Sequence, residues 1–231
     1  MLPKIVWSIP RLGTFNLHAS LLPKYRGAAP INWAIINGEK ETGVTTFMID
    51  EEIDTGSIMF SEKCAILPDD NFESLHDKLM NLGSQLVLKT VDALSMGKIN
   101  FTIQSSVEAT MGDIPSAPKL NKENTKICWE KNSEDICNFI RGLSPFPTAY
   151  TFIKNIVSEE VTLVKIYDST YEVSSGTNTP GHIITDSKSF IKVECTSGLI
   201  NIKSLQLPGK KRLNVRDFLA GFRDIQNYKF I

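Results

Sequence analysis

The sequence predicts an α/β fold in two parts, a region of alternating helices and strands followed by a small β-barrel or sandwich. Helix and strand signals alternate up to residue 104. Residues 105–118 lack hydrophobic periodicity and are rich in Gly and Pro, which is typical of a linker. Beyond them, short β-branched segments recur between Gly and Pro residues. We therefore expect domains at 1–104 and 119–231, joined by a linker at 105–118.

The first clear strand signal lies at 14–19, where apolar and polar side chains alternate. Phe15 and Leu17 lie on one face of this strand, and Asn16 and His18 lie on the other. The chain then enters a loop that contains Pro and Gly. Polar side chains at the end of a strand, beside such a loop, are well placed to meet a ligand.

Pro and Gly bound the elements that follow. Pro23 and Gly27 break regular structure after the first strand. Pro30 is suited to the first turn of a helix, and Gly38 closes that helix. The elements expected up to residue 66 are a short helix or turn at 3–10, a strand at 14–19, a loop at 20–27, a helix at 28–37 and strands at 44–49 and 57–66.

The strongest helix signal covers residues 72–95. Asp70 or Asn71 can cap its start, and Gly97 stops it. Gly83 lies inside it, at a cost of about 1 kcal/mol relative to Ala. The apolar face is formed by leucines at helical spacing, namely Leu75, Leu79, Leu82, Leu86 and Leu94.

The second half begins with a short amphipathic helix and continues as strands. Ser133 is expected to cap this helix, which is followed by a Pro-Phe-Pro turn at 145–147. A closing helix is expected at 215–223. The apolar side of the first helix consists of Ile136, Phe139, Ile140 and Leu143, and the strands are expected at 149–153, 161–167, 181–185, 189–195 and 199–205.

Composition excludes several classes of protein. With 42% apolar and 22% charged residues, the chain is neither disordered nor fibrous. No apolar stretch is long enough to span a membrane, and the first residues lack the pattern of a signal peptide. The four cysteines are scattered without a CxxC motif. Free thiols and a cytoplasmic location are therefore expected.

The net charge of −1 conceals an asymmetry between the two halves. Residues 1–118 hold 9 basic and 14 acidic residues, whereas 119–231 hold 16 basic and 12 acidic residues. A polyanion would be attracted to the second half rather than the first. Ordinary scatter of charges explains the same numbers, so both interpretations stay open at this point.

The sequence lacks the motifs of dinucleotide binding, of P-loop phosphate binding and of the serine nucleophile elbow. It contains no GxGxxG, no GxxxxGK[ST] and no GxSxG. Of the three histidines, His76 and His182 lack partners at metal-ligand spacing and are expected to be structural or exposed. No metal site is expected.

Asn16 and His18 are the best candidates for catalysis. An amide and an imidazole side by side can donate two hydrogen bonds to one oxygen, which suits the oxyanion of acyl transfer. The alternative is that both are satisfied polar groups at a strand end. Asp54, in a DTG turn, could orient His18 and accept a proton from an attacking amine. Spacing alone does not bring Asp54 to His18.

These residues lie in segments with a strong resemblance to a known family. NLHASLLP (16–23), YRGAAPI (25–31), ETGVT (41–45) and DTG (54–56) resemble the N10-formyltetrahydrofolate-dependent formyltransferases. IRGLSPFPTA (140–149) and LQLPGKK (205–211) resemble the C-terminal domain of the methionyl-tRNA formyltransferases. The resemblance covers essentially the whole chain.

The resemblance implies a fold, a site and a reaction. The first half would be the C-terminal part of a doubly wound, Rossmann-like domain, and the second an OB-like barrel that helps to hold tRNA. Asn16, His18 and Asp54 fall on catalytic positions, and Ser20, Leu21, Leu22 and Pro23 on the tetrahydrofolate-binding stretch. The implied reaction is transfer of the formyl group of 10-formyltetrahydrofolate to methionyl initiator tRNA. The resemblance also implies a monomer and a reaction without a metal. The tRNA backbone would meet Lys119, Lys122, Lys126, Lys210, Lys211 and Arg212, or Lys210–Arg212 would be a solvated loop.

The resemblance also implies a further segment before the equivalent of Met1, which supplies part of the sheet and one wall of the folate site. The chain is therefore expected to be a fragment or a truncated product with little or no activity alone. Two other functions stay open. The acceptor could be glycinamide ribonucleotide, an amino sugar nucleotide or water, or the chain could be a non-catalytic remnant that binds RNA.

Overall fold

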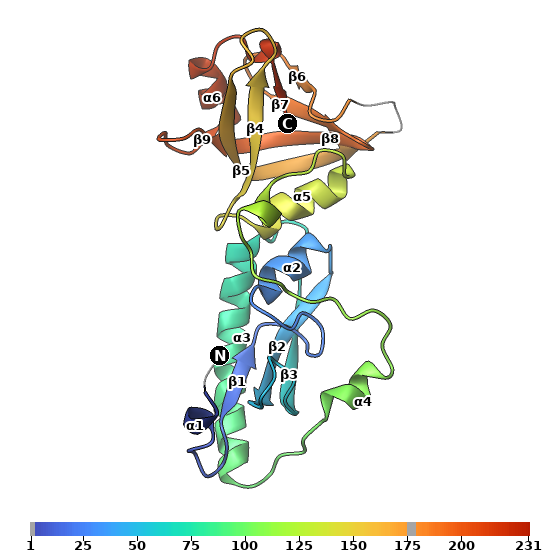
Figure 1. Cartoon of the computed structure of the whole chain (residues 1–231), viewed down its shortest axis with the longest axis vertical. Helices are drawn as coiled ribbons and strands as arrows, with labels where there is room; N and C mark the ends of the chain where they lie inside the picture. Colours follow the sequence, from blue (N-terminus) through green and yellow to red (C-terminus); the bar gives the residue numbers. More distant parts are fainter. Residues whose placement is uncertain (1–2, 175–178) are drawn as a thin grey trace. The chain divides into compact units, whose positions relative to one another are not determined.

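The computed structural model describes residues 3–174 and 179–231, which divide into two compact units. The first unit comprises Met1–Ala34 and Glu39–Leu120, and the second comprises Ile35–Gly38 and Asn121–Ile231 (Figure 1). Residues 1–2 of the predicted first domain lie outside the described residues. The predicted domain limits stay a prediction.

A three-stranded sheet in the order β1-β2-β3 organises the first unit. β1 (Phe15–His18) and β3 (Ile58–Ala65) both pair antiparallel with β2 (Glu41–Met48). The register sets His18 opposite Thr45. The α/β class is confirmed, and each pair of neighbouring strands in this sheet is antiparallel.

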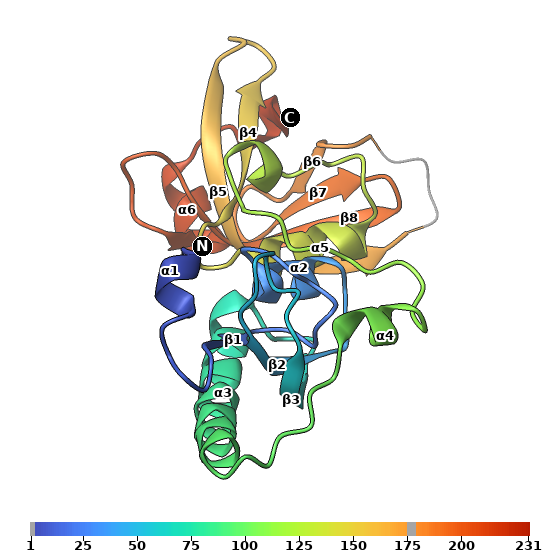
Figure 2. The same cartoon turned by 60° about the horizontal axis from the view of Figure 1, so that its bottom comes forward.

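A long helix packs against this sheet. α1 (Lys4–Trp7) and α2 (Pro30–Ile36) are short, whereas α3 (Phe72–Ser95) runs along β2 and β3, as Figures 1 and 2 both show. A Cβ atom at Gly83 would lie 2.6 Å from Cδ2 of Leu17. Glycine in the middle of α3 therefore leaves room for the Leu17 side chain of β1.

The start of α3 is held by polar side chains. Asn71 is the N-cap and forms a capping box with Ser74. Burial alone would raise the pKa of the Asp70 carboxyl. Hydrogen bonds from Lys78, the Leu67 N–H and Ser74 outweigh that effect and lower the pKa below its ordinary value. Asp70 therefore stays ionised and fixes the turn that leads into the helix.

The second unit is a strongly bent antiparallel sheet in the order β10-β4-β5-β8-β7-β6. An antiparallel bridge between His182 and Lys229 links the β6 end to the β10 end, so the sheet nearly closes into a barrel. This agrees with the predicted OB-like domain. The strands are β4 (Ala149–Asn155), β5 (Val161–Val173), β6 (Ile183–Thr185), β7 (Ile191–Cys195), β8 (Gly198–Gln206), β9 (Leu213–Asn214) and β10 (Tyr228–Phe230).

The main helix of this unit, α5 (Ser133–Gly142), packs against β5 and β8. The prediction that Ser133 caps it is wrong by one residue. Asn132 is the N-cap, and its side chain accepts a hydrogen bond from the Asp135 N–H. Asn132 reaches the third residue of the helix, whereas Ser133 already has helical geometry. The remaining elements here are η1 (Glu123–Thr125), α6 (Val215–Gly221) and η2 (Ile225–Asn227).

The predicted linker contains structure that the sequence pattern did not indicate. α4 (Gln104–Glu108) lies at its start. Near its end, the Tyr25 N–H donates to the Pro115 carbonyl at 2.6 Å, and the Ala28 N–H donates to the Ala117 carbonyl at 2.8 Å. The last part of this segment is therefore bound to the loop after β1.

Candidate active site

His18 ends β1 and is buried, with 6% of its surface exposed. Its Nε2 atom lies 2.8 Å from the Tyr25 carbonyl oxygen. Because a carbonyl can only accept, Nε2 carries a proton and donates. The ring also stands edge-on to Phe47, with centroids 6.4 Å apart. These contacts fix the imidazole plane and turn its Nδ1 edge toward the DTG turn.

Asp54 meets that edge. Its Oδ2 atom lies 3.7 Å from His18 Nδ1, and only 13% of its side chain is exposed. The same oxygen accepts a hydrogen bond of 2.9 Å from the Gly27 N–H. Gly27 has φ +125°, and a Cβ there would lie 2.4 Å from the Ala117 carbonyl. Only glycine fits this approach, so the loop after β1 can present its N–H to Asp54.

Asn16 lies two residues before His18 on the same side of β1. In contrast to His18 it is exposed, and its Oδ1 atom accepts a 3.0 Å hydrogen bond from the Leu17 N–H. With Oδ1 engaged, its amide N–H groups remain as donors toward a substrate. The structure thus places His18 and Asp54 in contact, with Asn16 exposed on the adjoining part of the strand.

The predicted folate-binding stretch, residues 20–23, is pinned to β2. The Thr45 hydroxyl donates to the Ser20 carbonyl at 2.7 Å and accepts from the Leu22 N–H at 3.2 Å. The Ser20 hydroxyl donates to the Lys24 carbonyl at 2.6 Å. Pro23 is buried within the same loop. The loop is therefore held in one conformation beside His18.

A cavity of about 370 Å³ adjoins this stretch within the first unit. Leu21 and Leu22 line it together with Thr42. The Thr42 hydroxyl is the one buried side-chain polar atom without a hydrogen-bond partner among the residues that the structure describes. Because this oxygen is itself buried, it is not exposed to the cavity.

Two residues that sequence reasoning missed surround the DTG turn. The guanidinium of Arg26 and the side-chain amide of Gln104 both bind the Asp54 main-chain carbonyl, at 3.0 and 2.9 Å. Arg26 lies inside the quoted YRGAAPI segment, which was a signal for it. Gln104 stands at the end of an irregular stretch, and no pattern in the sequence singled it out.

The basic residues predicted to contact the tRNA backbone do not all lie in one unit. Lys119 belongs to the first unit, and the other members belong to the second. Lys210 and Lys211 are exposed in the connection between β8 and β9. The Arg212 guanidinium is anchored, because it lies 4.6 Å from the Tyr167 ring centroid and donates to Ser204 at 2.7 Å.

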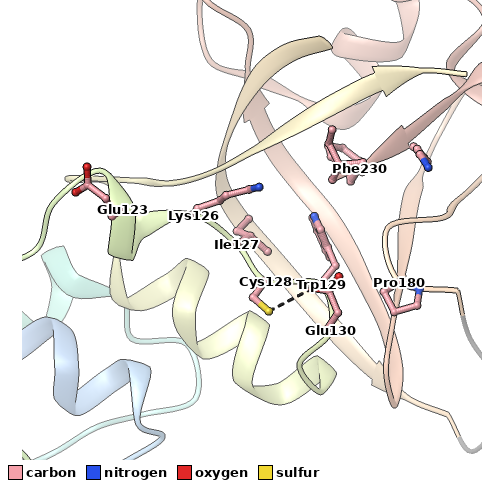
Figure 3. Close-up of a pocket in the computed structure, with 10 residues that line it drawn as sticks. Glu123, Lys126, Ile127, Cys128, Trp129, Glu130, Pro180 and Phe230 are labelled. Carbon is pink, nitrogen blue, oxygen red and sulfur yellow. Dashed lines mark hydrogen bonds between the residues drawn. The ribbon is translucent and has the colours of Figure 1, made fainter. Parts of the chain in front are cut away.

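Two of the other predicted cations have local roles in the barrel unit. The main-chain carbonyl of Lys122 accepts a hydrogen bond from the Tyr150 hydroxyl at 2.9 Å. Lys126 lies over the Phe152 ring, 5.4 Å from the centroid. It also lines a cavity of about 530 Å³ in which Trp129 and Phe230 face each other, with ring centroids 5.4 Å apart (Figure 3).

The described residues contain no group of three or more His, Cys, Asp or Glu placed to hold a metal ion. Within the same ranges, no helix is both long enough and apolar enough to cross a membrane. His76 and His182 are largely exposed, as predicted. All four cysteines are free.

Comparison with known proteins assigns both parts of the chain. Residues 1–91 match the formyl transferase family, and residues 119–223 match the formyl transferase C-terminal domain. The chain is 49% identical to a methionyl-tRNA formyltransferase of Bacteroides fragilis over 99% of its own length and 70% of the relative. It is 52% identical to one of Flavobacterium johnsoniae over 96% of its length and 68% of the relative.

Solved structures agree on the fold. HypX from Aquifex aeolicus in complex with tetrahydrofolic acid gives a TM-score of 0.66 at 20% identity, over 96% of this chain and 37% of HypX. The N-formyltransferase of Helicobacter canadensis gives 0.61 at 26% identity, over 81% of this chain and 64% of that chain. This chain thus spans little more than a third of HypX. From the family matches and the identity of its relatives, the chain belongs to the methionyl-tRNA formyltransferase family.

Proposed function

We propose that this chain transfers a formyl group from 10-formyltetrahydrofolate to the amine of methionine esterified to initiator tRNA. The buried His18–Asp54 contact of 3.7 Å, at the end of β1, is the observation that supports this most. It joins two residues far apart in sequence, beside a loop pinned to β2. Relatives that are about half identical to the chain are named methionyl-tRNA formyltransferase. These names support methionyl-tRNA as the acceptor.

In the proposed reaction the amine attacks the formyl carbon on N10 of the folate. A carbon–nitrogen bond forms, and the formyl oxygen becomes an oxyanion. The Asn16 amide and protonated His18 donate to that oxygen. Nε2 of His18 donates to Tyr25, so the substrate oxygen is proposed to meet the Nδ1 edge, beside Asp54 Oδ2 at 3.7 Å. A well-placed donor of this kind contributes about 3–4 kcal/mol to transition-state stability.

Asp54 completes the proton balance. Its carboxylate accepts a proton from the attacking amine, with the charge on His18 and the Gly27 N–H stabilising the anion before the transfer. When the intermediate collapses, the bond from carbon to N10 breaks, and the proton held by Asp54 passes to N10, which restores the carboxylate. The products are the formylated amine and tetrahydrofolate. No covalent enzyme intermediate is needed.

The folate donor is proposed to bind along residues 20–23. Leu21 and Leu22 present apolar surface to the neighbouring cavity, which Thr42 and Ser61 also line. The same cavity is also lined by charged residues, namely Lys24, Glu39, Glu41 and Lys63, so a ligand with both apolar and polar parts suits it. Folate ligands named with the HypX and Helicobacter canadensis structures support the same donor.

A single-turnover assay tests the proposed function. The protein is held in excess over methionyl-tRNA with 10-formyltetrahydrofolate present, so that slow transfer is detected. We expect transfer that is slow, in line with the little activity expected for this chain alone, but faster than without protein. A parallel reaction offers a dTDP-amino sugar, because the Helicobacter canadensis structure contains dTDP-3-aminofucose. Transfer to the sugar alone, or to neither acceptor, would overturn the proposal, and tRNA binding without transfer would favour the remnant.

The tRNA contact makes a separate prediction for Lys210 and Lys211. Their exposed ammonium groups are proposed to lie against phosphates, where each contact releases counterions. Replacing both with Ala should weaken tRNA binding and reduce the slope of log affinity against log salt by about 1.5. Filter binding or fluorescence anisotropy at several salt concentrations measures both quantities.

The matched control replaces Lys98 and Lys188, which are also exposed and lie outside the predicted set. It removes the same number of charges, so a general charge effect would change its slope equally. Equal slopes for the two double variants would show that Lys210 and Lys211 make no specific phosphate contact.

A further inference from the structure

The side chain of Gln104 is buried, with only 2% of the residue exposed, at the start of α4. Its Nε2 group donates to the Asp54 carbonyl at 2.9 Å and to the Gly56 carbonyl at 2.8 Å. The two acceptors lie on either side of Thr55. One amide group therefore clamps the main chain of the DTG turn at two points.

The oxygen of the same amide binds Arg26. Oε1 of Gln104 accepts from Arg26 Nη2 at 2.5 Å and from Arg26 Nε at 3.1 Å. The Nε group also donates to the Asp54 carbonyl at 3.0 Å. Nη2 is paired with Glu108 of α4 at 2.5 Å. Gln104 and Arg26 thus hold each other and jointly hold the main chain of Asp54.

These contacts close a ring around the carboxylate of Asp54. Arg26 precedes Gly27, whose N–H binds Asp54 Oδ2 at 2.9 Å. Gln104 therefore restrains both the main chain that carries Asp54 and the segment that holds its carboxylate. Asp54 needs such restraint because its φ of +58° is a left-handed conformation that non-glycine residues adopt rarely.

We propose that Gln104 is a positioning residue for formyl transfer, one that sets the separation between Asp54 and His18 without touching the substrate. The proposal rests on the proposed function, because it deepens the description of that site. The side chain must supply two N–H donors and an acceptor together, which only a primary amide does. Asn is too short to span the same three partners.

Two substitutions distinguish the hydrogen bonds of the Gln104 side chain from its volume. Gln104→Met keeps the volume of the side chain and removes every hydrogen bond. Gln104→Glu keeps the bond to Arg26 but places carboxylate oxygen against the Asp54 and Gly56 carbonyls, where it repels them. Gln85→Glu is the matched control, because Gln85 is exposed on α3.

We expect the single-turnover rate at saturating donor to fall about 10- to 100-fold in both Gln104 variants, since a catalytic group displaced by about 1 Å loses that much. The donor concentration for half-maximal rate should change little. A merely structural role predicts the opposite pattern, with a smaller folded fraction and an unchanged rate per folded molecule.

Nitrogen NMR of the imidazole rings gives a second readout that needs no turnover. The chain has only three histidines, so the signals are resolvable. The His18 signals should shift in both Gln104 variants, whereas those of His76 and His182, which are exposed, should not. If no transfer occurs even in the wild type, the proposed function fails, but the NMR result still decides the role of Gln104.

Unchanged His18 signals together with an unchanged rate, in either Gln104 variant that keeps a folded amide spectrum, would overturn the proposal. If Gln104→Met loses that spectrum, Gln104→Glu alone decides, since it retains the ion-paired contact to Arg26. Should that variant also unfold, Arg26→Lys takes its place. This change keeps the charge while breaking the forked contact to Gln104, and the same two readouts apply.

Discussion

Replacing His18 by Ala is expected to slow formyl transfer by about 10²–10³-fold, the usual cost of losing one donor to a developing oxyanion. The imidazole is buried between Tyr25, Phe47 and Asp54, so no other side chain takes its place. The measurement is the single-turnover rate of formylmethionyl-tRNA formation with donor at saturation.

The matched control for this variant is His76→Ala. His76 is the histidine of α3, about half exposed, and its ring meets Phe72 and Asp77 of the same helix. Its removal should leave the rate unchanged. If His18→Ala and His76→Ala transferred formyl groups at the same rate, His18 would have no part in the reaction.

The second large effect is expected from Asp54→Asn, a change of charge with almost no change of shape. The Asn oxygen can still accept the Gly27 N–H, so the loop should keep its position. The variant loses the negative charge beside His18 and the ability to take a proton from the amine. We expect transfer to fall by about 10²–10⁴-fold, measured in the same assay.

Glu52→Gln serves as the control for Asp54→Asn. Glu52 is exposed and only two residues away, so it tests whether any lost charge near the turn has the same effect. Its rate should match the wild type. A loss in Glu52→Gln as large as in Asp54→Asn would assign the effect to the general field of the loop rather than to Asp54.

Elements governed by local sequence were predicted well. The bounds of α3 agree with the predicted 72–95, because its leucine spacing, cap and terminal glycine all act within the segment. β5 runs to Val173, whereas the prediction ended this strand at 167. Residues 168–173 are mostly exposed and lack a strand pattern of their own, but they form a strand because they pair with β8. Such pairing over a long sequence distance leaves little trace in the strand itself.

The candidate site divides in the same way. Asn16 and His18 were suggested by strand alternation alone, whereas Asp54 needed the family resemblance, since its contact with His18 spans β1, a loop and β2. Gln104 had no signal at all. Its role comes from hydrogen bonds to main-chain carbonyls, which depend on the path of the backbone and not on a motif.

A double-mutant cycle on His18→Ala and Asp54→Asn tests the central claim most directly, since it compares the single-turnover rates of the wild type, both single variants and the double variant. If the imidazole and the carboxylate act as one unit on the same carbonyl, the double variant will be about as slow as the slower single variant. If the two losses multiply, the groups act independently, and the account of a paired site at the end of β1 is contradicted.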